Sequence, residues 1–237
     1  MRPRFPYLNE HERFDFPPPE TADEDGVVCL GGNLSPGMLL SAYSQGLFPW
    51  FSENQPILWW SPDPRFVVFP EEAHTSASMR KVLRQGRFEM KFDLAFREVV
   101  CACSSARRPG QGGTWITGGM IEGYCRLHEL GYAHSVEAWT GGMLAGGLYG
   151  VCLGRIFFGE SMFSRLPNAS KAAFLFLASF LQSRGFGLID SQVRTDHVAS
   201  LGGREIPRAE YLALLSALLR HDTLKGKWGS EEELGIR

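Results

Sequence analysis

The spacing of hydrophobic residues changes near residue 65 of the chain. Beyond that point, short apolar runs that suit β-strands alternate with longer runs whose apolar residues recur at helical spacing. Strands are predicted at 66–69, 88–92, 134–139, 143–151, 155–159 and 189–193. Helices are predicted at 78–84, after Asp93, at 117–130, from Asn168 to 184, and at 207–219, with Asp93 and Asn168 as N-terminal caps. The pattern predicts an α/β domain over residues 63–237.

The first 62 residues follow a different pattern and predict a small N-terminal α/β domain. Residues 1–25 are rich in proline and acidic residues, so we expect an extended surface segment. Ser35 is placed to cap a helix that starts at Pro36 and closes at Gly46. Tryptophan and phenylalanine rings then cluster near prolines up to the proline-rich boundary at 61–64.

The order of elements from Thr117 onward is helix, three strands, helix, strand, helix. This order matches an acetyltransferase-like (GNAT-like) domain, which holds an acyl donor between two diverging central strands. Many other α/β domains share the order, so it predicts the fold class more strongly than the function.

The composition describes an ordinary globular chain. With 237 residues, of which 44% are hydrophobic and 21% charged, the sequence suits one large domain or one domain with a small companion. The longest nearly apolar run, residues 172–181, is too short to cross a bilayer, and the N-terminus has no apolar signal core, so we expect a cytoplasmic protein. The five cysteines are scattered and predict buried free thiols, with no metal site and no cofactor.

Positive charge is concentrated in one stretch of the chain. The net charge is only −2, but residues 79–108 contain eight basic and three acidic residues. A local basic surface is enough to bind a phosphate backbone, because the free energy comes from counterion release at the contacts themselves. The candidates for tRNA binding are Arg80, Lys81, Arg84 and Arg87. A solvated helix face is the alternative interpretation.

Three polar residues mark the candidate active site. Glu160, Asp190 and Gln192 lie beside strongly apolar segments, where a carboxylate without a partner costs several kcal/mol. The sequence 159–163, GESMF, lacks the last glycine of a hydrolase nucleophile elbow. The segment that follows, where an acyl-CoA transferase needs glycines to approach a pyrophosphate, reads ESMFSRLPNASK, which disfavours an acyl-CoA donor.

Five ordered motifs carry a resemblance to a known family. They are GLFPWFS at 46–52, ILWWSPDPR at 57–65, TWITGGMIEGYCRLHELGYAHSVE at 114–137, GESMFSRLPNASK at 159–171 and LIDSQVRTDHVASLGGREIPR at 188–208. From about residue 28 onward, the chain closely resembles the bacterial leucyl/phenylalanyl-tRNA–protein transferases. Two small departures are Asn33, where the family pattern has aspartate, and a longer loop at 107–111.

The resemblance implies an enzyme that moves Leu or Phe, and also Met, from aminoacyl-tRNA onto proteins that begin with Arg or Lys. The product would carry an N-degron for a Clp protease. The implied enzyme is a cytoplasmic monomer that needs no cofactor. Two alternatives remain: an acetyltransferase-like enzyme that uses acyl-CoA, and a non-catalytic module that binds tRNA or N-degrons.

The resemblance also assigns roles to individual residues. Trp50 and Trp115 match positions that hold the terminal adenosine, and Tyr124 is a further substrate-binding candidate. The positions matching the hydrophobic amino-acid pocket are Leu148, Phe157, Met162, Phe174, Leu177 and Ile189. Asp190 and Gln192 match catalytic positions, and their spacing predicts side chains on one face of a strand. We expect Asp190 to accept or orient a proton through Gln192, and Glu160 to hold the acceptor's amine or basic side chain.

Overall fold

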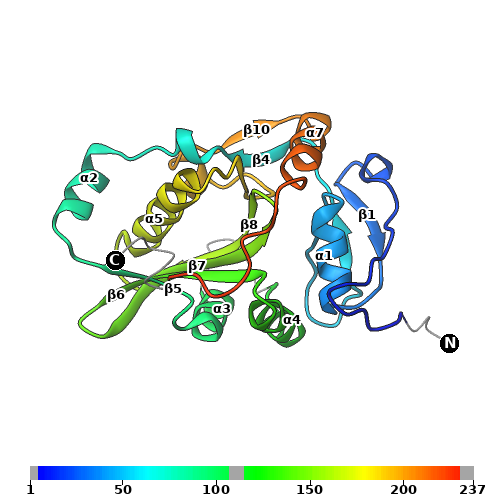
Figure 1. The fold of residues 1–237 in the computed structure, drawn as a ribbon, viewed down its shortest axis with the longest axis horizontal. Coiled ribbons are helices and arrows are strands. Elements are labelled where there is room, and N and C mark those ends of the chain that lie inside the picture. Colours follow the sequence, from blue (N-terminus) through cyan, green and yellow to red (C-terminus); the bar gives the residue numbers. More distant parts are fainter. Residues whose placement is uncertain (1–4, 107–114, 230–237) are drawn as a thin grey trace.

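The computed structural model describes residues 5–106 and 115–229 as two β-sheets with helices packed against them. The smaller sheet is antiparallel and has the order β1-β3-β2, from Val27–Leu30, Leu58–Trp60 and Phe48–Pro49. It lies beside α1 (Pro36–Ser44) at one end of the molecule (Figure 1). A short 3-10 helix, η1, spans Pro19–Thr21 in the segment that precedes β1.

The larger sheet has seven strands in the order β10-β4-β9-β8-β7-β6-β5. The strands are β4 (Arg65–Val68), β5 (Glu89–Phe92), β6 (Ala133–Thr140), β7 (Met143–Leu153), β8 (Ile156–Ser164), β9 (Leu188–Asp190) and β10 (Arg204–Ile206). All neighbours are antiparallel except β8 and β9, which are parallel. The sheet is therefore mixed, and its parallel pair lies at the centre.

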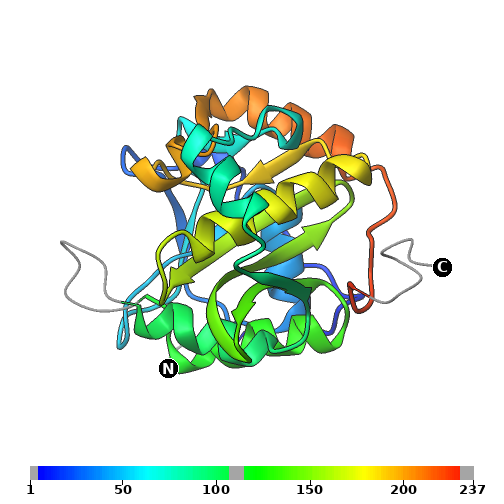
Figure 2. The same cartoon turned by 90° about the vertical axis from the view of Figure 1, so that its left-hand side faces the viewer.

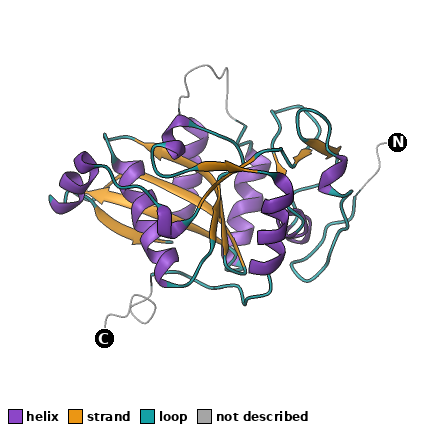
Figure 3. Ribbon diagram, turned by 90° about the horizontal axis from the view of Figure 1, so that it is seen from above, coloured by secondary structure: helices purple, strands orange, loops and turns teal. Residues whose placement is uncertain are grey.

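Helices cover both faces of this sheet. The helices are α2 (Ala77–Arg84), α3 (Phe96–Ser105), α4 (Gly118–Glu129), α5 (Ala169–Ser183), α6 (Asp196–Ala199) and α7 (Arg208–Leu218), with the 3-10 helix η2 at Pro70–Glu72. Helix α5 lies over one face, whereas α3 and α4 lie under the other, as Figures 1 and 2 show. Figure 3 shows the same elements from above, with the helices in purple and the strands in orange. No helix in the described ranges is long and apolar enough to span a membrane.

The two faces of the sheet contribute to two buried clusters. The α5 core includes Phe92, Leu148, Phe157, Phe174, Leu177, Ile189 and Trp228. The α3–α4 core includes Tyr43, Phe96, Tyr124, Leu127, Tyr149, Phe158 and Phe163. Neighbouring residues of one strand enter different cores, as Phe157 and Phe158 do in β8, because side chains alternate across a sheet.

Most predicted elements are confirmed, but several of their ends differ. Strand β8 continues to Ser164 instead of ending near Gly159, and β9 ends at Asp190 instead of Val193. The sequence does not predict strands β1, β2, β3 and β10 or helix α6, because short segments have no clear period. The basic residues Arg107 and Arg108 and the predicted loop at 109–113 lie outside the described residues.

The predicted helix caps are wrong in their bonding. Ser35 precedes α1, but its Oγ accepts from the N–H of Leu8 (3.1 Å) and makes no capping bond to the helix. Asn168 precedes α5 in a left-handed conformation (φ 71°), again without a capping bond. Asn33 tethers the N-terminal segment, since its Nδ2 donates to the carbonyl oxygen of Pro6 (2.8 Å), which an aspartate could not do.

Asp93 is a buried junction between distant segments instead of the cap of α3. Its Oδ1 accepts from the N–H of Ser135 (2.8 Å), and its Oδ2 lies 2.8 Å from Nδ1 of His134. The same Oδ2 accepts from the N–H of Trp228 (2.8 Å) near the C-terminus. The N–H groups of Leu94 and Ala95, just before α3, donate to Oε1 of Glu137.

The five cysteines lie outside any disulfide in the described part of the chain, but only two of the five are buried, whereas burial was predicted for all. Cys103 and Cys152 are buried, whereas Cys29, Cys101 and Cys125 are half-buried. Burial raises the pKa of the Cys152 thiol to about 12, so this thiol stays protonated and inert at neutral pH.

We predict that Asp93→Ala lowers the free energy of unfolding by about 3 kcal/mol, because several buried donors lose their acceptor at once. Urea denaturation measures the change. As a control, Asp15→Ala removes a carboxylate from an exposed pair with Arg13 and should change stability by less than about 0.5 kcal/mol. If the two substitutions lowered the free energy of unfolding equally, Asp93 would not hold these distant segments together.

Candidate active site

The two central parallel strands, β8 and β9, separate after a short stretch of pairing. Strand β8 pairs with β9 only from Ile156 to Phe158, which lies opposite Asp190. Its pairing with β7 continues on the other edge as far as Ser164. Residues 159–162 of β8 are half-buried instead of fully buried. Beyond Phe158, β8 is therefore unpaired on the edge that faces β9, next to Asp190.

A β-bulge at Glu160 lies just past this separation. Gly159 is opposite Gly150, but Ser161 is already opposite Tyr149, so Glu160 is the extra residue. Phe157 and Met162 are five positions apart, which would place them on opposite faces of a regular strand. Both nevertheless pack against the α5 core. Glu160, two positions after Phe158, lies on the α3–α4 side by ordinary alternation, and the bulge returns Met162 to the α5 side.

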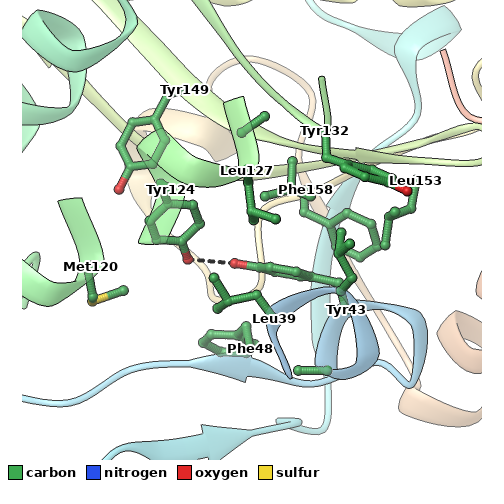
Figure 4. Packing of buried hydrophobic residues seen from close by; sticks show 14 of the residues in the cluster. Leu39, Tyr43, Phe48, Met120, Tyr124, Leu127, Tyr132, Tyr149, Leu153 and Phe158 are labelled. Atoms are coloured by element: carbon green, nitrogen blue, oxygen red, sulfur yellow. Dashed lines mark hydrogen bonds between the residues drawn. The ribbon is translucent and has the colours of Figure 1, made fainter. Parts of the chain in front are cut away.

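The Glu160 carboxyl group is held by two phenols. Its Oε1 accepts from Tyr43 (2.7 Å) and its Oε2 from Tyr124 (2.5 Å). The two hydroxyl oxygens are themselves 2.6 Å apart, as the dashed line in Figure 4 shows. Burial raises the pKa of Glu160 to about 7, despite the two hydrogen bonds, which act to lower it. Glu160 can therefore gain and lose a proton near neutral pH.

Both phenols remain donors under the same conditions. Burial, together with the negative charge of Glu160, holds the pKa values of Tyr43 and Tyr124 well above their ordinary range. Tyr124 was predicted as a substrate-binding residue, whereas sequence reasoning missed Tyr43. No local signal distinguishes Tyr43 from the other buried residues of α1, because its partner Glu160 lies 117 positions away.

Asp190 lies fully buried in an ion pair. Arg65 approaches it with two nitrogens, Nε to Oδ1 (2.9 Å) and Nη2 to Oδ2 (2.7 Å). The N–H of Gln192 donates to Oδ1 (2.9 Å), and the hydroxyl of Tyr211 donates to Oδ2 (2.9 Å). Each carboxylate oxygen thus accepts two hydrogen bonds. A group engaged in this way is suited to orienting its neighbours more than to taking up a proton.

Arg65 connects this ion pair to the N-terminal part of the chain. Its Nη1 donates to the carbonyl oxygen of Gly46 (3.2 Å), and its guanidinium lies over the rings of Phe48 (4.8 Å) and Tyr211 (4.4 Å). Burial opposes the charge on Arg65, but the Asp190 carboxylate outweighs it, so the pKa of Arg65 is raised and the guanidinium stays charged. Sequence reasoning missed this residue, although it ends the motif ILWWSPDPR.

Gln192 follows β9 and is not on the same strand face as Asp190. The prediction was wrong because β9 ends at Asp190 and Gln192 has a left-handed backbone (φ 58°). Its N–H donates to Asp190 Oδ1, and its carbonyl oxygen accepts from the N–H of Phe66 (3.1 Å). Among the described residues, its buried Nε2 has no hydrogen-bond partner. Because a buried amide donor is costly to leave unpaired, this group is suited to a substrate oxygen.

The predicted pocket residues come together on one face of the sheet. Leu148 in β7 lies directly opposite Met162 in β8, and Phe157 in β8 lies beside Ile189 in β9. Phe174 and Leu177 of α5 belong to the same buried cluster. These side chains pack together between α5 and the sheet.

The predicted adenosine-binding tryptophans lie with the other core. Trp50 and Trp115 are half-buried and pack against the α3–α4 core, to which Tyr124 also belongs. Trp50 has the ring of Trp60 at 5.4 Å, and its carbonyl oxygen accepts from Nε1 of Trp60 (2.6 Å). The tryptophans and the apolar pocket set are thus placed in different layers, with the Glu160 region of β8 between the layers.

The predicted tRNA-binding residues form an exposed surface far from the smaller sheet. Arg80, Lys81 and Arg84 are exposed on α2, and Arg87 is exposed just beyond it, whereas Met79 anchors the helix in the α5 core. Figure 1 shows α2 at the opposite end of the molecule from α1 and β1. The basic residues are therefore available to a large ligand that also reaches the centre of the sheet.

Comparison with known proteins decides the family. Residues 67–216 match the model of the leucyl/phenylalanyl-tRNA protein transferases, and residues 32–63 match the model of that family's N-terminal domain. The chain belongs to this family. It is therefore an aminoacyl-tRNA-dependent transferase that acts on proteins. The resemblance found in the sequence motifs is confirmed.

Relatives of this transferase match along most of their length. A leucyl/phenylalanyl-tRNA–protein transferase from Myxococcus xanthus is 54% identical over 220 residues, which cover 93% of this chain and 94% of the relative. A protein of the same name from Syntrophus aciditrophicus is 56% identical over 218 residues, covering 92% and 91%. Another from Aromatoleum aromaticum is 54% identical over 226 residues, covering 94% and 95%.

For this transferase we predict that Arg65→Met lowers the free energy of unfolding by about 3–5 kcal/mol, because Asp190 is left buried and charged without its partner. The double variant Arg65→Met/Asp190→Asn should recover at least half of that loss, since the uncompensated charge is gone. Arg204→Met removes an arginine from the half-exposed pair with Glu72 and should cost less than about 1 kcal/mol. Urea denaturation of all three variants would contradict this account if the double variant were no more stable than Arg65→Met.

Proposed function

We propose that this transferase moves Leu or Phe, and also Met, from aminoacyl-tRNA to the α-amino group of proteins that begin with Arg or Lys. The new N-terminus would act as an N-degron for Clp-dependent degradation in the cytoplasm. The observation that carries the proposal is the Glu160 carboxyl group, with its pKa raised to about 7, at the bulge where β8 and β9 separate. A half-buried group that exchanges protons at neutral pH is suited to an incoming amine.

The proposed fold is an acetyltransferase-like (GNAT-like) domain over 63–237 with a small N-terminal domain over 1–62. The early end of the β8–β9 pairing supports the first part, because that fold uses diverging parallel strands to admit its acyl donor. The separate three-stranded sheet supports the second part.

The donor has two parts that need different surfaces. Trp50 and Trp115 offer aromatic surface for the terminal adenosine, and a stacked base is worth about 1–3 kcal/mol. The apolar residues between α5 and the sheet would receive the amino-acid side chain. A narrow pocket admits Leu, Phe and Met but hinders residues branched at Cβ, a discrimination of roughly 1–3 kcal/mol. The exposed cations of α2 would hold the tRNA backbone, and the enzyme would act as a monomer without a cofactor.

The proposed reaction is aminolysis of the ester that links the amino acid to the tRNA. The acceptor's α-amine attacks the ester carbonyl carbon, a C–N bond forms, and the C–O bond to the terminal ribose breaks. The amine begins largely protonated, because its ordinary pKa is about 8. Glu160 would bind this amine, or the acceptor's basic side chain, and is able to take up the proton that the amine loses. The second proton, which the attacking nitrogen loses as the amide forms, goes to the ribose oxygen, which leaves as a hydroxyl group.

Gln192 and Asp190 would hold the reacting atoms in place. The unpaired Nε2 of Gln192 is a donor for an oxygen of the substrate, such as the ester carbonyl. Asp190 fixes the backbone of Gln192 through a 2.9 Å hydrogen bond. Because both oxygens of Asp190 are already engaged, we assign it the orienting role that the sequence left open, and not that of the proton acceptor.

The direct test is transfer of labelled Leu from Leu-tRNA to a peptide that begins with Arg, compared with a matched peptide that begins with Ala. We expect transfer to the Arg peptide alone. Gln192→Ala should lower kcat/KM about 100-fold, because it removes the donor to the substrate. Gln182→Ala, on the exposed side of α5, should leave kcat/KM unchanged. Absence of transfer by well-folded enzyme with intact Leu-tRNA would refute the proposed function.

Asp190→Ala is a poor substitute for Gln192→Ala in this experiment. It leaves the buried Arg65 without its counter-ion, so a loss of transfer would reflect misfolding as readily as chemistry.

The pH dependence tests the role of Glu160. If transfer needs ionised Glu160, activity falls as the pH drops through its pKa of about 7. Tyr124→Phe removes a hydrogen bond to the carboxylate that lowers this pKa, so the acidic limb of the kcat profile should move up by about half a pH unit or more. Tyr132→Phe is the matched control, because it removes a buried phenol that, within the described residues, does not hydrogen-bond to Glu160. It should not move the acidic limb. A limb that stays in place in Tyr124→Phe, or moves down, would exclude Glu160 as the titrating group.

A further inference from the structure

The described C-terminal end of the chain, residues 220–229, forms a strap that crosses the molecule from α7 toward β5 (Figure 1, red). The strap lies beyond residues 67–216, the part that matches the family model. Thr223 Oγ1 accepts from the N–H of Gly154 (2.9 Å), and the N–H of Gly226 donates to the carbonyl oxygen of Gly131 (3.2 Å). A Cβ at Gly131 would lie 2.5 Å from the nitrogen of Gly226, so the close approach requires glycine there.

The strap ends in a tryptophan that is inserted into the α5 core. Trp228 is 1% exposed, its N–H donates to Asp93 Oδ2 (2.8 Å), and its Nε1 donates to the carbonyl oxygen of Leu224 (3.1 Å). Its ring stacks on His134 with centroids 3.8 Å apart and planes inclined by 7°. The one polar group of the indole, Nε1, is therefore satisfied, and hydrogen bonds as well as packing fix the position of Trp228.

Trp228 also contacts a residue of the proposed amino-acid pocket. The ring centroids of Trp228 and Phe157 are 6.0 Å apart, with an interplanar angle of 40°. Met162, the half-buried member of the pocket set, lies five positions along β8, on the far side of the bulge and of the point where β9 separates. Phe157 is the fully buried end of the set on β8, where this strand is still paired with β9, and Trp228 packs against it there.

We propose that Trp228 is a positioning residue that sets the depth of the amino-acid pocket by holding Phe157 forward, and so determines how Leu is selected over Phe. This inference rests on the proposed function and assigns a new residue to the same site. Protein interiors are closely packed, so Phe157 has no room to retreat while the indole is in place. A smaller side chain at 228 leaves space behind Phe157, and the pocket becomes longer on the α5 side of the sheet.

The test is to measure kcat/KM for Leu-tRNA and Phe-tRNA, with a peptide that begins with Arg, in wild type and in Trp228→Leu. The ratio of Phe to Leu transfer should rise on the order of tenfold, because filling or emptying a hydrophobic pocket by a few methylene groups changes discrimination by that much. Trp228→Phe, a milder change, should raise the ratio less and provides the measurement if Trp228→Leu does not fold.

Phe96→Leu is the matched control. Phe96 is a buried ring at the start of α3 that stacks on His128 (4.2 Å, 3°), as Trp228 stacks on His134, but it belongs to the other core. It should lower the melting temperature and leave the Phe-to-Leu ratio within about twofold. If the Trp228 variants lose thermal stability but keep the wild-type ratio, or lower it, Trp228 only fills the core and the inference is wrong. If wild-type enzyme transfers neither amino acid, the proposed function fails and the inference falls with it.

Discussion

The buried ion pair between Arg65 and Asp190 is the interaction on which the arrangement of the site depends. Two charges at zero exposure are stable together only when every hydrogen-bonding atom has a partner. Here the remaining partners come from Gly46, Tyr211 and Gln192, which belong to separate segments of the chain. The smaller sheet, the central strands and α7 are therefore held to a single centre. This fixed geometry lets Tyr43 of α1 reach Glu160 on β8.

One irregularity in β8 gives this strand two chemical sides. A regular strand would place either Phe157 or Met162 on the α5 side, but not both, because they are an odd number of positions apart. The bulge at Glu160 restores Met162 to the apolar face and leaves the carboxyl group among phenols on the other. With this one extra residue, the apolar surface and the titrating carboxyl group lie on opposite faces of the same strand.

Local patterns were sufficient to predict most of the helices and strands, because apolar spacing is a property of neighbouring residues. They were not sufficient for partners that are distant in sequence. Asp93 has the residue type and position expected of a helix cap. Its partners are nevertheless His134 and Trp228, which a local pattern does not connect to it. Arg65 is one arginine among many until its partner is known. The cost of polar groups in apolar segments singled out Glu160, Asp190 and Gln192, and the resemblance matched the last two to catalytic positions. The bulge and the left-handed backbone at Gln192 required coordinates.

The proposed reaction also depends on groups that are distant in sequence and are brought together by the fold. Its two substrates have opposite needs, since an apolar side chain must leave water and a charged amine must lose a proton. The α5 core supplies the first environment, and the Glu160 phenols supply the second. Gln192 follows β9, and a hydrogen bond to Asp190 holds its backbone. Among the described residues, the Nε2 of its side chain has no partner. In the proposed mechanism, the bond between the two substrates forms where these environments meet.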